Sequence, residues 1–358
     1  MQRIVGVDTA RGLAILGMFV AHLGLVRDRD VLSPTGWFFI ADGRPSALFA
    51  LLAGVGLTFM TRRARWSGQP GEWRRQRVRI VKRAGVLYIL GWVLTLLGTP
   101  VAVILPAYAV MFVFCLPFLH LSARTLLAWA AGIAAVMQVP VVLVRAQIGE
   151  GSPWRMVPGV GELLTGYYPA LLWVAYLLVG LVVGRLDLRS RLSPVLLMGY
   201  GTAAAVLGYG TGRVLTLLVD PAPGSLAALL TSTEPHTDSA LELVGNSGVA
   251  VAVIGLCLLV SRVQVGRLLL LPVSAAGAMA LTVYSLHIVY IRILGSQAVW
   301  NPVSNLPLIW LVLGTLAAAT VWQLLLGQGP FERALHALIR TAPDPAPWPH
   351  PEVSQRRR

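Results

Sequence analysis

The sequence is poor in charge, in lysine and in cysteine, and each shortage narrows the class of protein. Charged residues make up only 12% of the 358 residues and hydrophobic residues 56%, which is not the composition of a soluble globular protein. The two cysteines, Cys115 and Cys257, lie inside apolar runs, so we expect neither a disulfide framework nor a cysteine metal site. Lys82 is the single lysine beside many arginines, a bias that we interpret as that of a GC-rich bacterial genome.

Long apolar runs are what the sequence has instead, and its mean hydropathy is +0.72. A hydrocarbon core of ~30 Å takes about 20 helical residues. With that length as a ruler, the fold class that we predict is all-α, a polytopic transmembrane helical bundle with about ten spans. The expected spans are 5–26, 37–60, 80–98, 101–120, 125–144, 168–185, 194–218, 240–260, 270–294 and 306–326.

The basic residues predict the orientation of the bundle. Most of them fall in the N-terminus, the tail and every second loop, whereas the intervening loops hold only Arg27, Arg29, Arg145 and Arg155. Because cytoplasmic loops carry the excess of Lys and Arg, both termini are predicted to be cytoplasmic. This topology accounts for the net charge of +14 without a nucleic-acid partner.

We expect three segments along the chain. Residues 1–328 would form the transmembrane domain, 329–341 a short amphipathic helix at the membrane interface, and 342–358 a disordered, Pro-rich basic tail. The basic loop 61–83 fits the positive-inside rule and contact with anionic lipids; attraction of a phosphorylated cytoplasmic ligand is the alternative.

The first span carries a polar stripe. Asp8 and Arg11 are i,i+3 neighbours that can pair, and His22 lies within ~20° of Arg11 around the helix and ~16 Å further along it. The alternatives to a functional stripe are an interfacial ion pair at the helix end and a histidine that only bonds a neighbouring helix.

The second span is interrupted by the polar sequence ADGRPS. Pro45 favours a first helical turn, and Asp42 is placed to cap it or to accept a hydrogen bond from His22 and raise its basicity. Arg44 either serves the site or extends toward the membrane surface. A small-residue face, expected to pack against the first helix, comprises Ser46, Ala50 and Gly54.

Further polar groups are predicted to gather near the outer ends of later spans. They are Tyr284, His287 and Arg292 in the ninth span, Arg213 in the seventh, and His236 in the loop before the eighth. Because ionisable groups are expensive inside a bilayer, their convergence predicts a functional site. A zinc site from His22, His236 and His287 is conceivable, but the His-x-x-x-His spacing is missing and we expect no metal.

The opening block Val7-Asp8-Thr9-Ala10-Arg11-Gly12-Leu13-Ala14 resembles that of the heparan-α-glucosaminide N-acetyltransferase family and of the related YeiB-type bacterial membrane proteins. Ala41-Asp42, the block LFALLAG, the block ALLWVAYLLVGLVVGRLDL and the closing GPFE extend the similarity over most of the chain.

The resemblance implies a membrane acyltransferase that moves an acyl group, in the simplest case acetyl, from cytoplasmic acyl-CoA to a sugar or envelope glycan on the far side. It implies His22 as the catalytic base or acyl relay, with Asp42 orienting it and Arg11 as a ligand-binding or structural group. For such a reaction we further expect His287 to act as a second acid or base and Arg44 or Arg292 to stabilise the oxyanion. Binding roles are expected for the remaining polar residues of the predicted site, which are Asp8, Arg213, His236 and Tyr284.

The expected location is the bacterial cytoplasmic membrane, with lipids as neighbours, and nothing in the sequence excludes a homodimer. The competing hypothesis is a transporter or flippase for a glycan or lipid-linked substrate, in which the polar stripe lines a path. That hypothesis predicts inverted repeats, which the sequence does not show. A structural or signalling protein would leave the buried histidines without a purpose.

Overall fold

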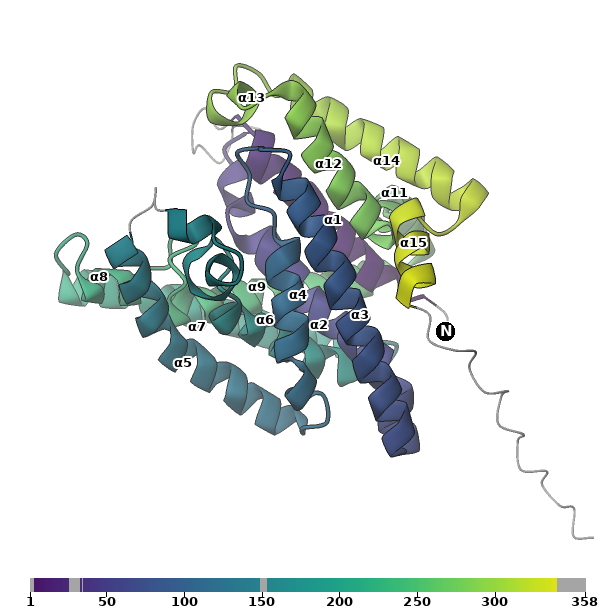
Figure 1. The fold of residues 1–358 in the computed structure, drawn as a ribbon, viewed down its shortest axis with the longest axis horizontal. Helices are drawn as coiled ribbons and strands as arrows, with labels where there is room; N and C mark the ends of the chain where they lie inside the picture. The colour runs from purple at the N-terminus through teal and green to yellow at the C-terminus, as the bar shows by residue number, and fades with distance from the viewer. Residues whose placement is uncertain (1–2, 26–32, 34, 149–152, 340–358) are drawn as a thin grey trace, which may run out of the picture.

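The computed structural model describes residues 3–25, 33, 35–148 and 153–339. The predicted tail 342–358 and the loop residues Arg27 and Arg29 lie outside these ranges. Within the described ranges every regular element is helical, in agreement with the predicted all-α class (Figure 1).

The α-helices are α1 (Val5–Leu23), α2 (Arg44–Ser67), α3 (Pro70–Thr95), α4 (Leu105–Phe114), α5 (Ala123–Ile148), α6 (Ala170–Arg185), α7 (Ser193–Val219), α8 (Leu226–Thr231), α9 (Ala240–Val260), α10 (Gln264–Leu269), α11 (Leu271–Ala278), α12 (Ala280–Leu294), α13 (Gln297–Trp300), α14 (Leu306–Leu326) and α15 (Pro330–Ile339). Short 3₁₀ or π turns lie at η1 (Phe38–Ala41), η2 (Leu116–Phe118), η3 (Pro153–Met156) and η4 (Gly161–Thr165).

Among the described residues, six helices are long and apolar enough to cross a membrane, or seven if α11 and α12 form one span. The sequence predicts about ten because it also counts α3, α4 and α6. Helix α4 has only 10 residues and α6 only 16, while the first half of α3 is basic. These three complete the bundle without meeting the length and composition of an isolated span.

The segment 270–294, predicted as one continuous span, is broken. Helices α11 and α12 meet at Met279 at an angle of 87°. A break of this kind leaves backbone groups without helical partners, so at membrane depth it must face protein or a water-filled cavity.

The basic segment 61–83 is a tight helical hairpin and not an open loop. Helix α2 continues to Ser67, Gly68 ends it at φ 64°, and α3 begins at Pro70. Pro fits the first turn of a helix and Gly the left-handed position after its end, so the residues at the turn explain its sharpness.

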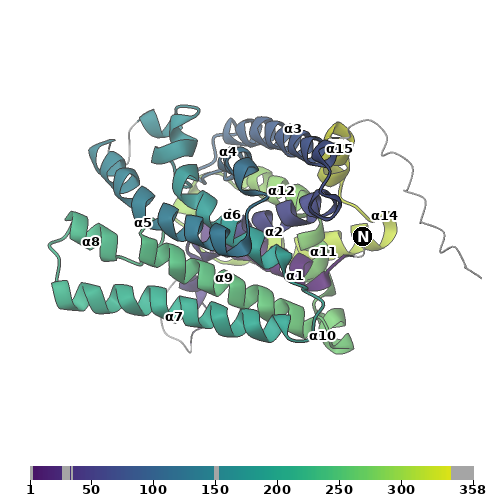
Figure 2. The ribbon, with the colours of Figure 1, turned by 90° about the horizontal axis from the view of Figure 1, so that it is seen from below.

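Helices α1, α2 and α6 form the centre, between the long antiparallel pair α7–α9 on one side and α3 with α15 on the other (Figure 2). Helix α1 packs against α11 and α2. The face around Gly54 contacts α6 and not α1 as the sequence predicts: a Cβ at Gly54 would lie 2.1 Å from the carbonyl oxygen of Leu177. Two glycine-bearing faces, on α2 and α6, allow this close approach.

Helix α15 occupies the position predicted for the short amphipathic helix and packs against α3 and α12 (Figure 1). Its buried apolar residues are Leu335 and Ile339, whereas Leu338 is 63% exposed. The helix therefore covers the bundle at the break between α11 and α12.

Candidate functional site

His22 and His287 form a contacting pair at the end of the bundle where α1 ends. Nδ1 of His22 lies 3.3 Å from Nε2 of His287, and the two rings are stacked with an angle of 11° between their planes. Phe19 and Tyr284 pack against the His287 ring with centroids 5.1 and 5.0 Å away. The side chain of His287 is fully buried, whereas His22 is only partly so. The two histidines that the sequence selected from separate spans thus share one hydrogen bond.

The opposite end of the polar stripe is an ion-paired cluster. Asp8 accepts from Arg11 at 3.1 Å, as the i,i+3 spacing predicts, and also pairs with Arg3 at 3.3 Å. Arg11 donates further to the carbonyl of Gly277, 3.3 Å away, and Arg3 to the carbonyl of Ala278. The stripe of α1 therefore holds the carbonyl end of α11.

A carboxylate from the far end of the chain completes the break. Glu332 of α15 accepts from the backbone N–H groups of Leu281 and Thr282 at 2.6 and 3.1 Å, and from the Thr282 hydroxyl at 2.6 Å. These N–H groups are the unsatisfied donors of the first turn of α12, which an acidic group stabilises. At the break, arginines thus bond the carbonyl groups at the end of α11, and Glu332 bonds the N–H groups at the start of α12.

A basic cavity opens beside Arg11 at the end where α1 begins. It has a volume of about 770 Å³ and is bounded by the start of α1, the end of α2 and the turn after α6. Two aspartates, Asp8 and Asp187, face a larger set of arginines in its lining. The arginines are Arg3, Arg11, Arg62, Arg65, Arg185 and Arg189. This excess of positive charge suits a ligand that carries several phosphates.

A second, narrower cavity adjoins the first, because Arg11 and Phe59 line both. It has a volume of about 310 Å³ and leads past the α11–α12 break to the rings of Tyr108 and Tyr284. The Tyr108 hydroxyl is buried there and has no hydrogen-bond partner among the described residues. Since Tyr284 packs on His287, the two cavities and the histidine pair form one sequence of neighbouring sites.

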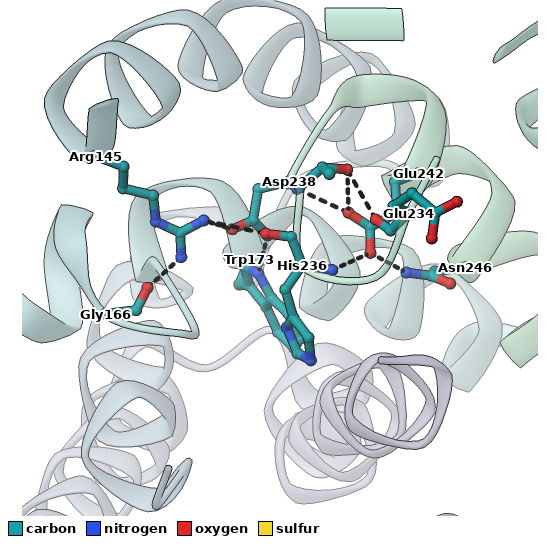
Figure 3. Close-up of polar contacts among 9 residues, drawn as sticks. Arg145, Gly166, Trp173, Glu234, His236, Asp238, Glu242 and Asn246 are labelled. Carbon is teal, nitrogen blue, oxygen red and sulfur yellow. Dashed lines mark hydrogen bonds and ion pairs between the residues drawn. The ribbon is translucent and has the colours of Figure 1, made fainter. Parts of the chain in front are cut away.

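A polar network joins the end of α5, the segment before α6 and the loop before α9 (Figure 3). Asp238 pairs with Arg145 and accepts from the Trp173 indole N–H at 2.7 Å, and Arg145 also donates to the carbonyl of Gly166. Glu242 accepts from the backbone N–H of His236 at 3.0 Å, in addition to bonds from Thr237, Asp238 and Asn246.

His236 is partly buried, and its ring lies among aromatic rings in this network. Its ring is nearly parallel to that of Trp173, with centroids 6.3 Å apart, and meets Tyr167 and Tyr168 edge-on. Burial lowers the pKa of His236 below its usual value; Asp238 opposes the shift, and Arg145 adds to it. His236 also lies within electrostatic range of His22, so the third predicted histidine belongs to the same region.

Asp42 and Arg44 occupy the entry to α2. Arg44 donates to the Tyr209 hydroxyl at 3.1 Å and to the carbonyls of Phe39 and Ile40. It therefore holds η1 against α7. The carboxylate of Asp42 acts electrostatically on His236. The partner that the structure gives to Nδ1 of His22 is His287, so the predicted bond between Asp42 and His22 stays a prediction.

Arg213 and Arg292 are exposed on α7 and α12, and within the described part of the chain no hydrogen bond or ion pair joins either to the histidine pair. Among the residues that the structure describes, no group of three His, Cys, Asp or Glu side chains could hold a metal ion.

Glu242 is the principal site residue that the sequence analysis missed. Two signals could have found it: it is an acidic residue inside an apolar span, and Ser239-x-x-Glu242 has the spacing of a capping box. In the structure the Ser239 hydroxyl does accept from the backbone N–H of Glu242, at 3.0 Å.

Comparison with known proteins gives one match. The family model described as heparan-alpha-glucosaminide N-acetyltransferase, catalytic, matches residues 3–213, which run from the start of α1 into α7. No curated protein and no solved structure matches the chain.

Proposed function

Because the chain belongs to the heparan-α-glucosaminide N-acetyltransferase catalytic family, whose model covers more than half of it, we propose that it transfers an acetyl group from acetyl-CoA to a sugar across the membrane. The observation that carries the proposal is the sequence of neighbouring sites from the basic cavity, past Arg11, to the pair His22–His287.

The donor fits this arrangement by its chemistry. Acetyl-CoA has a phosphate-rich nucleotide at one end and a thioester at the other, joined by a thin linear arm. The arginines of the larger cavity would bind the phosphates, and the arm would follow the narrower cavity past Tyr108. The thioester would then reach Tyr284 and His287. Arg11 and His22 are ~16 Å apart along α1, so the arm has to span about this distance between the phosphate-binding arginines and the histidine pair.

His22 is the proposed general base. With its proton on Nδ1, His22 donates to Nε2 of His287, and its own Nε2 is free to take the proton from the acceptor amine or hydroxyl. The acceptor attacks the thioester carbonyl, the C–S bond breaks, and the proton held by His22 passes to the departing thiolate. The products are the acetylated sugar and free CoA.

His287 takes the orienting part that the sequence analysis gave to Asp42. It fixes the tautomer of His22 and accepts a hydrogen bond from the imidazolium that forms. Asp42, Arg44 and the network of Glu242 would shape the acceptor side around the pair. Arg213 and Arg292 would make peripheral contacts with an anionic or polar acceptor.

The proposed location is the bacterial cytoplasmic membrane, with both termini and the basic cavity facing the cytoplasm. The acceptor would be an extracytoplasmic glucosaminide, glycan or glycolipid. Every proposed site residue comes from a single chain, so the proposed reaction does not require a second copy. A homodimer is compatible with this arrangement.

The test is acetyl transfer from labelled acetyl-CoA to methyl α-D-glucosaminide by the purified protein in lipid nanodiscs. His22→Ala is expected to lose at least about a hundredfold in rate, because a positioned general base contributes that much. His120→Ala is the matched control, since His120 is exposed in a turn.

Full activity in His22→Ala would contradict the assignment of the base. Uptake of the glucosaminide into proteoliposomes without consumption of acetyl-CoA would instead support the transporter hypothesis.

A further inference from the structure

The outer face of α3 carries exposed residues that the proposed reaction does not use. Helix α3 lies at the edge of the bundle, beside α4 and α15 (Figure 2). Ile80, Ala84 and Leu87 are buried on its inner face. Along the opposite face, exposed cations come first and exposed apolar side chains follow. A face of this composition suits a partner that is charged at one end and apolar at the other.

Three exposed cations lie in the first half of α3. They are Arg74, Arg77 and Lys82. The nearest acidic residue in the sequence, Glu72, is already paired with Arg75 at 3.2 Å. Within the described part of the chain, no carboxylate forms an ion pair with any of the three. Positive charges without internal partners at one place on the surface attract an anion.

Exposed apolar residues continue this face toward the other end of the helix. Val81 is 47% exposed, Ile89 67% and Leu96 80%. At 100° for each residue, these three fall with Arg74 and Lys82 within an arc of ~100° around the helix. At 1.5 Å for each residue, Lys82 and Leu96 are ~21 Å apart, which is enough to cross one leaflet of the hydrocarbon core, ~15 Å deep.

Gly85 leaves open space in the middle of this face. The residue is exposed, and among the described residues outside its own stretch of helix no atom lies within 4 Å of a Cβ built on it. Val81 lies about one turn before it and Ile89 about one turn after it. The face is therefore open to a flexible chain that runs along the helix.

A phospholipid with an anionic headgroup matches both halves of the face. Its phosphate meets cations at the membrane surface, and its acyl chains cover apolar side chains in the adjoining leaflet. A soluble phosphorylated ligand would match the cations and leave Val81 and Ile89 uncovered. A second copy of the chain, related by a two-fold axis along the membrane normal, would set the same cations opposite one another.

We propose that the outer face of α3 is a binding site for an anionic phospholipid. The side chains of Arg74 and Lys82 bind its phosphate, and its acyl chains lie along the helix past Gly85 and Ile89. This site goes beyond the proposed function and does not depend on it, because neither acetyl-CoA nor the sugar occupies this face.

Lys82 is the only lysine of the chain, which allows a test on one side chain. Reductive methylation of the purified protein with isotope-labelled formaldehyde marks its ammonium group and keeps the positive charge. The methyl NMR signal of Lys82 is assigned by its loss in Lys82→Gln. It is then followed in nanodiscs of phosphatidylcholine that contain increasing fractions of phosphatidylglycerol.

The Lys82 signal is expected to shift with the fraction of phosphatidylglycerol and to reach a plateau. Arg74→Gln is expected to raise the fraction needed for half of the shift about fivefold, the effect of one charge at an anionic surface. The matched control is Arg124→Gln, which removes the same charge at an exposed position at the start of α5 and is expected to leave the titration unchanged.

Three results would overturn the site. Equal titrations of Arg74→Gln and Arg124→Gln would show only the general attraction of a basic surface. The same shift caused by inorganic phosphate in pure phosphatidylcholine would show an anion site that needs no lipid. A shift in pure phosphatidylcholine that appears only when each disc holds two copies would assign the face to a second copy of the chain.

Discussion

At the scale of single residues, the pair His22–His287 is the centre of the proposed site. The sequence predicted both histidines as site residues from their positions in apolar spans. It could not predict that they bond each other, since their contact joins residues 265 positions apart. Asp42 was the favoured partner because it is near in sequence, and the packing of α12 against α1 supplies His287 as the partner of Nδ1.

His236 gives a pH-dependent prediction. Burial is the main cause that lowers the pKa of His236 in the folded protein. Below pH ~6.5 this residue is therefore protonated more readily in the unfolded chain than in the folded chain. The stabilising contribution of neutral His236 is therefore complete above that pH and is lost as the pH falls. The thermal midpoint of the wild type is expected to drop between pH 7 and pH 5.

His236→Gln is expected to show a smaller drop over the same interval, and His120→Gln, at an exposed position, the wild-type drop. The measurement is thermal denaturation in detergent from pH 5 to pH 8. If His236→Gln retained the full pH dependence, burial of a neutral His236 would be refuted.

At the scale of elements, the broken helix α11–α12 is the feature that the sequence did not reveal. The residues around the junction, 277–281, are apolar, and Met279 gives no sign of a break. The groups that stabilise the break come from elsewhere: Arg3 and Arg11 from the start of the chain and Glu332 from α15. A pattern within one segment cannot show caps supplied by other segments. The Ser239-x-x-Glu242 spacing is by contrast a local pattern, so the N-cap of α9 could have been predicted from the sequence, although it was missed.

Glu332 gives the prediction at this scale. Glu332→Ala would leave the first N–H groups of α12 without their acceptor and is expected to destabilise the protein by about 2 kcal/mol. It would also loosen α15 over the narrower cavity. The matched control is Glu234→Ala, at an exposed loop position.

Thermal denaturation of both variants in nanodiscs provides the measurement. Equal midpoints for the two variants would show that the carboxylate of Glu332 does not stabilise the break.

At the scale of the whole molecule, the sequence predicted the class of fold and the gathering of polar groups, but not the cavities. Hydropathy was enough for an all-helical membrane bundle, and the spacing of Asp8, Arg11 and His22 was enough to divide the site into two ends. The basic cavity needs arginines from the start of α1, the end of α2 and the turn after α6. Their convergence depends on how these helices pack, for which the chain holds no local pattern.

The central claim is that the donor binds at one end of the bundle and the acceptor at the other. An assay that supplies the two substrates on opposite sides of a membrane tests it most directly. Vesicles that contain the purified protein are supplied with labelled acetyl-CoA on one side and methyl α-D-glucosaminide on the other. In one of the two arrangements, donor outside or donor inside, labelled N-acetylated sugar is expected to form on the glucosaminide side while free CoA stays on the donor side. His22→Ala is expected to abolish the product, and His120→Ala is not. Product formed only when donor and acceptor share one side, or glucosaminide that crosses unmodified, would contradict the central claim.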